Sequence, residues 1–241
     1  MKFTSIAVTK EFKEDLDKLK VYKKESYMDI IKGLINKHNI ENLVVLAAGL
    51  GSRFKDKTKH RNKCTFMIKG KPIINNIVDL LKAKNTYVVT GHCEEDIKNS
   101  LKNKEIIYRT NPFYKRGILS SIWTVKDDLY GKEFVLTTGD NVFDISFFKE
   151  FIGVKGDIVA CVKDKKEGIE TFAMFVKFSK KGSMLFFDKL TDIASKSLRL
   201  IDLLKLLDIE MFEIKKQMDV DNDKDLEVAS ESNFYWYRKF E

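Results

Sequence analysis

The sequence predicts an α/β protein with a mostly parallel sheet between two layers of helices, preceded by a small β-α-α segment. Short apolar runs that end in glycine or another small residue recur along the chain, as is typical of strands buried on both faces of a parallel sheet. Segments with apolar residues at helical spacing separate these runs, and such alternation indicates a doubly wound sheet. The chain has 241 residues, 44% of them hydrophobic, which is enough for a substantial core.

Residues 1–40 are expected to form a strand and two helices that make up a first domain. Lys2–Thr9 alternates as a short strand does, Thr9 is placed to cap a helix, and Ser26 to open a second one. The pattern is similar to a ribbon-helix-helix module, in which strands of two chains pair and enter DNA. The expected solvent face lacks the Arg, Asn or Gln side chains that read base edges. Homodimerisation through this segment, or its docking on the rest of the chain, is therefore favoured over DNA binding.

The second domain, residues 41–241, begins with the most informative stretch. Leu43–Leu46 is expected to be a buried strand, and the small residues after it leave bare backbone where the strand ends, which is where open α/β sheets bind ligands. Exposed amides followed by clustered cations suit a polyphosphate. The cations of this stretch are Arg53, Lys55, Lys57, Lys59, Arg61, Lys63, Lys69 and Lys71.

Three interpretations of the glycines compete at this point. A dinucleotide site requires a third glycine where Phe54 stands, and an acid that Val88–Thr90 does not supply. A Walker-type loop requires Gly-Lys-Ser/Thr, whereas the chain has Ser52-Arg53-Phe54. An ordinary strand-to-helix turn with a solvated basic face is the third.

The sequence of the whole stretch favours a fourth interpretation of the glycines. Leu46–Arg53, with Lys63 ten residues later and Gly70-Lys71-Pro72 beyond, resembles the signature of the MobA-like and sugar-phosphate nucleotidyltransferases. The resemblance implies a Rossmann-like three-layer α/β/α fold with a mixed, mostly parallel sheet. It implies that Lys63 and Arg53 are catalytic. Asn62 stands where the family usually has proline, so the loop before Lys63 is expected to be less rigid. The nucleotide-binding residues that the resemblance implies are Leu46, Ala47, Ala48, Gly49, Leu50, Gly51, Ser52 and Arg53.

The next elements continue the alternation. Gly91 ends the second predicted strand, at the edge where ligands bind, and is expected to bind nucleotide. Asn111 and Ser121 lie in a stretch similar to the nucleotide-binding segment of phosphocholine and inositol-phosphate cytidylyltransferases, which implies the same role for both; Ser120 or Ser121 is also placed to cap the next helix. The predicted elements are helix Pro72–Lys82, strand Tyr87–Gly91, helix Glu94–Leu101 and strand Ile106–Tyr108.

Asp140 follows the apolar run Phe134–Leu136, where a central strand opens into the cleft. A carboxylate there is costly unless it is paired or metal-bound. The resemblance implies that Asp140 binds Mg²⁺ against the nucleotide phosphates. Asp144 is expected to cap the following helix.

A second acidic string lies near the C-terminus. In an extended conformation, Asp219 and Asp221 fall on the same side of the chain, and Asn222 or Asp223 is placed to cap a helix from Lys224. The string resembles the segment that supplies the second magnesium contact in phosphocholine-type enzymes, with Asn222 in place of the usual threonine. The resemblance therefore implies Mg²⁺ ligation by Asp219 and Asp221.

The remaining segments are assigned from their patterns. The tail from Asn233 to Phe240 is strongly aromatic, and we expect it to dock on the body or on a second subunit. The other predicted elements are strands Ile158–Val162 and Thr171–Phe178, a hairpin at Lys180–Gly182, helix Leu198–Leu207 and a last strand Ile209–Ile214.

Cysteine usage, charge and hydropathy limit the functional class. Cys64, Cys93 and Cys161 are scattered without metal-ligand spacing, which favours a reduced compartment, with Cys64 a packed thiol. No run is long and apolar enough to span a bilayer, and the N-terminus lacks the apolar core of a signal peptide, so we expect a cytoplasmic protein. The net charge of +8 fits an acidic ligand, a nucleic acid or a lysine-rich proteome equally well.

The resemblance thus implies an enzyme that transfers a nucleoside monophosphate from an NTP to a phosphorylated alcohol or sugar phosphate, releases pyrophosphate and uses Mg²⁺. CTP is expected, because the segments around Asn111 and Asp140 are similar to those of the cytidylyltransferases. Two alternatives stay open: a sugar-1-phosphate nucleotidyltransferase that uses UTP, GTP or dTTP, and a DNA-binding regulator with a nucleotide-sensing domain. The regulator would bind an operator in a salt-dependent way and release no pyrophosphate.

Overall fold

The computed structural model describes residues 7–18, 27, 40–192 and 198–232. The chain divides into two compact units, and the smaller one contains α1 (Lys10–Lys18). The Thr9 hydroxyl accepts a hydrogen bond from the Phe12 amide at 3.2 Å, which confirms the predicted helix cap. Ala7–Thr9 are not part of a strand. The rest of the predicted strand, most of the second helix and the aromatic tail lie outside the described residues.

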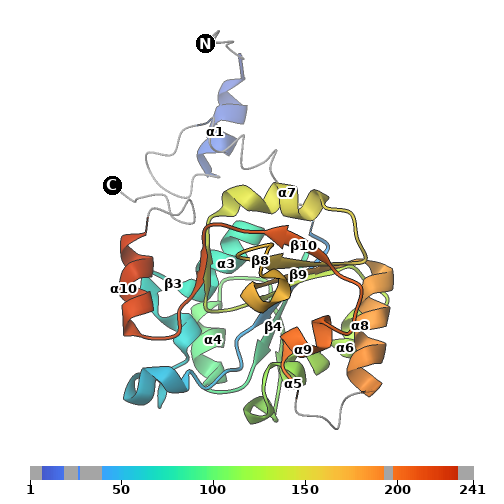
Figure 1. Ribbon diagram of the computed structural model, residues 1–241. Helices are drawn as coiled ribbons and strands as arrows, with labels where there is room; N and C mark the ends of the chain where they lie inside the picture. The colour runs from blue at the N-terminus through green and yellow to red at the C-terminus, as the bar shows by residue number, and fades with distance from the viewer. Residues whose placement is uncertain (1–6, 19–26, 28–39, 193–197, 233–241) are drawn as a thin grey trace. The chain divides into compact units, whose positions relative to one another are not determined.

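Strands lie at the centre of the larger unit (Figure 1). Seven of them form one sheet in the order β10-β8-β9-β6-β1-β4-β5. Among the described strands of this sheet, only β9 runs antiparallel to its neighbours. The prediction of a mixed, mostly parallel sheet is confirmed. The strands are β1 (Asn42–Leu46), β4 (Asn85–Thr90), β5 (Ile107–Thr110), β6 (Phe134–Thr138), β8 (Ile158–Val162), β9 (Phe172–Phe178) and β10 (Glu210–Glu213).

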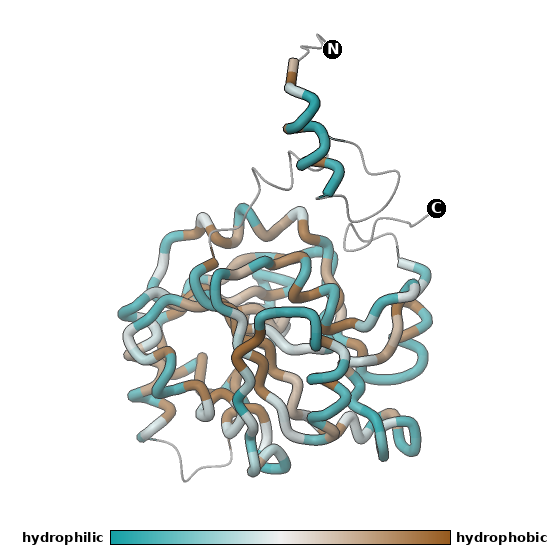
Figure 2. The backbone as a smooth tube through the Cα atoms, turned by 180° about the vertical axis from the view of Figure 1, so that it is seen from behind, coloured by the Kyte–Doolittle hydropathy of each residue, from teal (hydrophilic) through white to brown (hydrophobic). Residues whose placement is uncertain are grey.

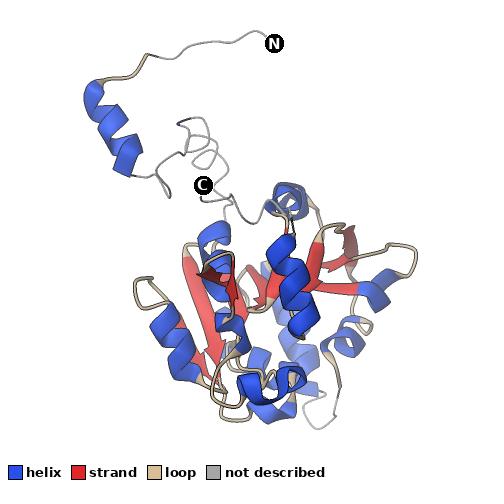
Figure 3. Cartoon of the chain, turned by 90° about the vertical axis from the view of Figure 1, so that its left-hand side faces the viewer, coloured by secondary structure: helices blue, strands red, loops and turns tan. Residues whose placement is uncertain are grey.

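Helices cover both faces of this sheet (Figure 3). Because successive side chains of a strand point to opposite faces, Leu43 and Val45 of β1 join one apolar cluster, and Val44 and Leu46 join the other. The apolar segments accordingly run through the middle of the larger unit (Figure 2). The first cluster is closed by α3 (Ile73–Leu81), α4 (Glu94–Ser100), α7 (Phe148–Gly153) and α10 (Asp223–Glu231), and the second by α5 (Ile118–Trp123), α6 (Lys126–Leu129), α8 (Lys180–Asp192) and α9 (Leu200–Leu204).

Short elements complete the unit. The antiparallel pair β7 (Asn141–Phe143) and β11 (Gln217–Asp219) joins the turn after β6 to the C-terminal acidic string. A second antiparallel pair is β2 (Met67–Ile68) with β3 (Lys71–Pro72). The 3-10 helices are η1 (Ser52–Thr58), η2 (Lys63–Thr65), η3 (Tyr114–Arg116), η4 (Ile145–Phe147) and η5 (Gly168–Thr171).

Three predictions about the secondary structure of the larger unit are wrong. The hairpin at Lys180–Gly182 is the first turn of α8, whose Gly182 amide donates to the Ser179 hydroxyl at 3.0 Å. A side chain at Gly182 would place its Cβ 1.9 Å from the Asp157 carbonyl oxygen, so this glycine permits close packing rather than a turn. Ser120 and Ser121 do not cap α5 but lie inside it. The strand predicted to be last, β10, is followed by β11.

The parallel strands end at one edge of the sheet, which we call the carboxyl edge. β1, β4, β5 and β6 run in one direction, and β8 shares it because both β8 and β6 are antiparallel to β9. The carboxyl ends of parallel strands are where open α/β folds bind ligands. The residues that follow these five strands are Ala47, Gly91, Asn111, Gly139 and Lys163.

Candidate active site

Lys63 stands at the centre of the polar groups on the carboxyl edge. It is the first residue of η2, and its ammonium forms an ion pair with Asp140 and a second one, at 3.0 Å, with Asp221. The Lys63 side chain is 16% exposed. Burial alone would lower the pKa of Lys63, but the charge and hydrogen bond of Asp140 outweigh burial and raise this pKa above its ordinary value. Lys63 therefore stays protonated and joins two acid-bearing loops.

Asp221 binds a second cation. The Arg53 guanidinium, from η1, forms an ion pair with the other oxygen of the same carboxylate. Burial opposes ionisation of Asp221, but the charges of Lys63 and Arg53 lower its pKa below the ordinary value. The loop is held by the next helix, since Asn222 caps α10 through the Asp225 amide at 3.1 Å, as predicted. The two predicted catalytic residues thus converge on one predicted metal ligand.

Asp219 lies beside this group. It pairs with Asn141 across β11 and β7, and the following amide, of Val220, donates to the Asp140 carbonyl at 3.0 Å. Burial, followed by the charge of Asp140, raises the pKa of Asp219 to about 6. Among the described residues, Asp219 forms no ion pair. Its carboxylate therefore lacks a cation of its own.

These acids suit a divalent cation in their chemistry. Carboxylate oxygens are the ligands that Mg²⁺ prefers, and a cation would relieve the repulsion between Asp219 and Asp140 that raises the pKa of Asp219. Within the described ranges, no three His, Cys, Asp or Glu side chains surround one point as ligands would. The Lys63 ammonium lies between Asp140 and Asp221 instead. Ligation by Asp140, Asp219 and Asp221 thus stays a prediction, and it requires the acids to exchange partners.

Gly49, Leu50, Gly51 and Ser52 form a glycine loop beside Lys63. Gly51 has a φ of 62°, which L side chains rarely adopt, and a Cβ there would lie 2.9 Å from Thr58 Cγ2 and 3.3 Å from Lys63 Cβ. Both the backbone conformation and the lack of space therefore exclude a side chain at this position. No amide from Gly49 to Ser52 donates to another described residue. Leu46, Ala47 and Ala48 are buried beneath the loop, whereas Leu50 and Ser52 are exposed. The backbone can therefore donate to an anion.

Asn62 corrects the expectation of a less rigid loop. Its side-chain amide donates to the carbonyl oxygens of Ala47 and His92, each at 2.8 Å, and the residue is fully buried. The residue that replaces the usual proline ties the Lys63 loop to the ends of β1 and β4.

Gly91, Asn111 and Ser121 lie in a neighbouring part of the carboxyl edge. The Asn111 side chain donates to the Ser121 hydroxyl at 2.9 Å, and the two residues are 1% and 5% exposed. A Cβ at Gly91 would lie 2.8 Å from Tyr114 Cβ, so this glycine permits close packing of η3. The structure shows how these residues hold the backbone, and their contact with a nucleotide stays a prediction.

Sequence reasoning missed two residues next to the acids. Lys163 follows β8 at the carboxyl edge, and its charge lowers the pKa of Asp219, although burial and Asp140 prevail. Its place directly after a predicted strand was a usable signal. Gln217 donates to Asp219 at 3.2 Å and to Asn141 at 2.9 Å, an arrangement that depends on the β7–β11 pairing and has no sequence signal.

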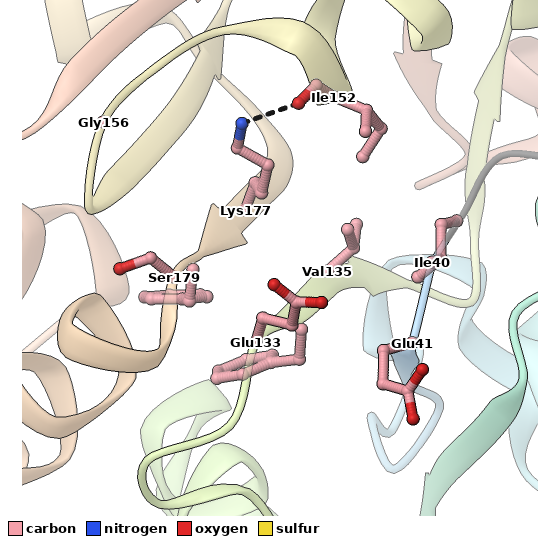
Figure 4. Close-up of a pocket in the computed structure, with 10 residues that line it drawn as sticks. Ile40, Glu41, Glu133, Val135, Ile152, Gly156, Lys177 and Ser179 are labelled. Atoms are coloured by element: carbon pink, nitrogen blue, oxygen red, sulfur yellow. Dashed lines mark hydrogen bonds between the residues drawn. The ribbon is translucent and has the colours of Figure 1, made fainter.

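A cavity of about 190 Å³ lies at the opposite edge of the sheet (Figure 4). Glu41 and Glu133 line it together with Lys177, whose ammonium donates to the backbone carbonyls of Ile152, at 2.8 Å, and Val154. Burial lowers the pKa of Lys177. The Lys177 ammonium is thus already hydrogen-bonded to backbone carbonyls. The cavity is therefore a poorer binding site for an anion than the carboxyl edge is.

Cys64, Cys93 and Cys161 are free thiols. Burial raises the pKa of Cys64, so this thiol next to Lys63 is packed and protonated, as predicted. In the part of the chain that the structure describes, we find no helix with the length and apolar character required to cross a membrane.

Comparison with known proteins agrees with this geometry. Residues 43–196 match the family model of the MobA-like NTP transferase domain. The UTP–glucose-1-phosphate uridylyltransferase AglF of Haloferax volcanii is 32% identical over 110 residues, which are 42% of this chain and 44% of that protein. The CTP:phosphoglutamine cytidylyltransferase of Campylobacter jejuni is 27% identical over 134 residues, 52% of this chain and 53% of that protein. The chain thus spans about half the length of these relatives.

Solved structures show the same fold. The CTP:phosphocholine cytidylyltransferase LicC of Streptococcus pneumoniae superposes with a TM-score of 0.63 at 16% identity, covering 80% of this chain and 99% of that one. The inositol-1-phosphate CTP transferase of T. maritima gives a TM-score of 0.61 at 17% identity, covering 80% and 96%. The expected Rossmann-like three-layer fold is confirmed. Since the family model covers well over half of the chain, the protein belongs to the family of the MobA-like NTP transferase domain.

Proposed function

We propose that the protein transfers a nucleoside monophosphate from an NTP, CTP in the first place, to a phosphorylated alcohol or sugar phosphate and releases pyrophosphate. The observation that supports this most is the position of Lys63, which bridges Asp140 and Asp221 beside the glycine loop, whose amides donate to no other described residue. Donors for a polyphosphate and acids for a divalent cation therefore meet at the carboxyl edge.

The chemistry requires positioning more than proton transfer. An oxygen of the acceptor phosphate attacks the α-phosphorus of the NTP, the bond from the α-phosphorus to the bridging oxygen breaks, and the electron pair leaves with pyrophosphate. The nucleophile is already ionised, so no general base is required. Arg53 and the amides of the glycine loop bind the leaving side, and Lys63 neutralises charge that develops at the α-phosphate.

Asp140, Asp219 and Asp221 are the residues that would hold Mg²⁺, which when bound neutralises the phosphates. Phosphate groups offer Arg53 and Lys63 alternative anionic partners. Release of Asp221 from these two cations would make its carboxylate available as a ligand.

The choice of CTP rests on the cytidylyltransferases among the relatives and on the segments around Asn111 and Asp140. A uridylyltransferase among the relatives keeps UTP as the second candidate. Lys163 is proposed to bind the acceptor phosphate. It lies near Asp219, and it follows β8, which lies in the half of the sheet away from β4 and β5.

The test is pyrophosphate release from the purified protein with Mg²⁺, each of CTP, UTP, GTP and dTTP, and a panel of phosphate esters that includes phosphocholine, inositol 1-phosphate and glucose 1-phosphate. We expect turnover with CTP and at least one ester. Lys163→Ala should raise the KM for the ester about tenfold and leave the KM for the NTP within about twofold, as expected for one lost charge-assisted bond. No pyrophosphate from any pair would overturn the proposal.

A further inference from the structure

Every polar atom of Asn62 is hydrogen-bonded, although the residue is completely buried. Its side-chain amide donates to Ala47 and His92, each at 2.8 Å, and its side-chain oxygen accepts from the Cys64 amide at 3.0 Å. Its backbone amide donates to the Asp96 carboxylate at 2.9 Å, and its carbonyl accepts from the Thr65 amide at 3.0 Å. A buried network with all its members satisfied holds a single geometry.

These bonds join three elements of the carboxyl edge. Ala47 follows β1, His92 lies just after β4, and Asp96 lies in the first turn of α4. Cys64 and Thr65 belong to η2, for which Asn62 is the N-cap. Asn62 is thus the point at which η2 is attached to the two strands that lie next to the glycine loop and to α4.

The backbone of Asn62 is extended, with ψ 130°, and its φ of −76° lies within the range that a proline ring would impose. The side-chain bonds hold the chain in the conformation that the proline usual in the family, as the sequence resemblance implies, would hold covalently. They also add a link that proline cannot make, because the bond to Asp96 uses the backbone N–H.

We infer that Asn62 is the positioning residue for Lys63, which follows it directly and begins η2. By fixing the start of η2 against β1, β4 and α4, it sets where the Lys63 ammonium lies relative to Asp140 and the glycine loop. The part of this inference that concerns turnover rests on the proposed function. The part that concerns the geometry of η2 does not.

The experiment compares Asn62→Ala, Asn62→Pro and a matched control, Asn42→Ala. Asn42 is also a buried asparagine of the β1 region, 3% exposed, which donates to the Glu133 carbonyl at 2.8 Å, but it lies at the opposite edge of the sheet. Asn62→Ala should lower kcat about 10- to 100-fold and change the KM for the NTP less than about threefold. Misplacement of Lys63 reduces stabilisation of the transition state more than it reduces binding of the substrate in the ground state. Asn62→Pro should regain part of this loss, and Asn42→Ala should keep kcat within about twofold.

Amide hydrogen exchange gives a readout that needs no activity. Asn62→Ala should lose protection at Cys64 and Thr65, the amides that Asn62 engages, and Asn42→Ala should not. If the wild type releases no pyrophosphate, the proposed function fails while exchange still tests the geometry. Wild-type kcat together with wild-type protection in Asn62→Ala overturns the inference, and so does an equal loss of kcat in Asn62→Ala and Asn42→Ala.

Asp96→Ala is the milder variant, for use if Asn62→Ala does not fold. It removes the acceptor of the Asn62 backbone amide and leaves the side-chain bonds. We expect a loss in kcat of about three- to tenfold, with the KM unchanged, since one of several tethers is lost. An unchanged kcat in Asp96→Ala would overturn the link to α4.

Discussion

The Lys63 ammonium and the Asp140 carboxylate form an ion pair in which the side chains are only 16% and 10% exposed. The pair connects η2 with the turn after β6, two segments that the sequence separates by more than seventy residues. Removing one partner of such a pair leaves the other charge buried and unpartnered, which is more damaging than losing an ion pair at the surface. The contact that stabilises the fold therefore involves the same residues to which the proposed function assigns catalytic and metal-binding roles.

Lys63→Met should lower turnover at least about 100-fold and the free energy of unfolding by about 2–4 kcal/mol, because the buried Asp140 carboxyl group loses its ion-pair partner. Pyrophosphate release and urea unfolding measure the two effects. Lys104→Met is the matched control, since Lys104 is 23% exposed and pairs with Asp79 away from the site. Normal turnover in Lys63→Met would refute the role assigned to Lys63.

The raised pKa of Asp219 predicts that the free energy of unfolding depends on pH. Its folded-state pKa of about 6 lies above the ordinary value of 3.8, so the folded chain holds this proton more tightly than the unfolded chain. The resulting stabilisation is present below pH 3.8 and is lost as the pH rises through 6, and by linkage it amounts to less than about 3 kcal/mol. Asp219→Asn lacks this pH-dependent stabilisation.

The measurement is urea unfolding of the wild type and Asp219→Asn between pH 4 and 7, with a chelator present. Relative to the variant, the wild type should lose stability across this range. A difference between the two proteins that does not change with pH would show that Asp219 ionises normally.

Arg53→Ala should weaken NTP binding with little effect on stability. Arg53 is 69% exposed, so its ion pair with Asp221 contributes less than about 1 kcal/mol to folding. The proposed contact of Arg53 with the nucleotide phosphates would be charge-assisted, so we expect the KM for the NTP to rise about tenfold or more. Lys84→Ala, at an exposed ion pair with Glu41, removes one positive charge elsewhere and should leave the KM unchanged. An equal change in both variants would indicate that net charge, rather than the contact, is responsible.

The parallel strands and the acids that follow them could be predicted from the sequence, because both have local sequence signals. The apolar run Leu43–Leu46 is buried on both faces, and Asp140 follows β6 as expected. Strand direction then requires that the residues after β1, β4, β5 and β6 share one edge. The motif predicts a role for Lys63 but not the 3-10 helix, η2, on which Lys63 reaches this edge.

The features that sequence reasoning missed depend on contacts between distant residues. β11 has only three residues and exists because β7 lies beside it. The pattern around Gly182 predicts a hairpin, whereas the close approach of the Asp157 carbonyl explains this glycine. Asn62 has no helical or strand signal, and its bonds to Ala47 and His92 come from tertiary structure alone.

Gly139 lies where the two loops of the site touch. A Cβ there would lie 2.9 Å from Cys64 Sγ and 3.3 Å from Ala47 Cβ, so Gly139→Ala forces the Lys63 loop away from Asp140. We expect overpacking to cost about 1–3 kcal/mol of stability, and turnover to fall about tenfold or more as the Lys63–Asp140 contact is displaced. Gly153→Ala is the control, because a Cβ at Gly153 meets nothing within 4 Å.

Cys64→Ala combined with Gly139→Ala removes the clashing sulfur and should recover much of the loss in stability and in turnover. Thermal unfolding and pyrophosphate release over the full double-mutant cycle measure this coupling, and strictly additive effects would mean that Cys64 is not what excludes a side chain at position 139.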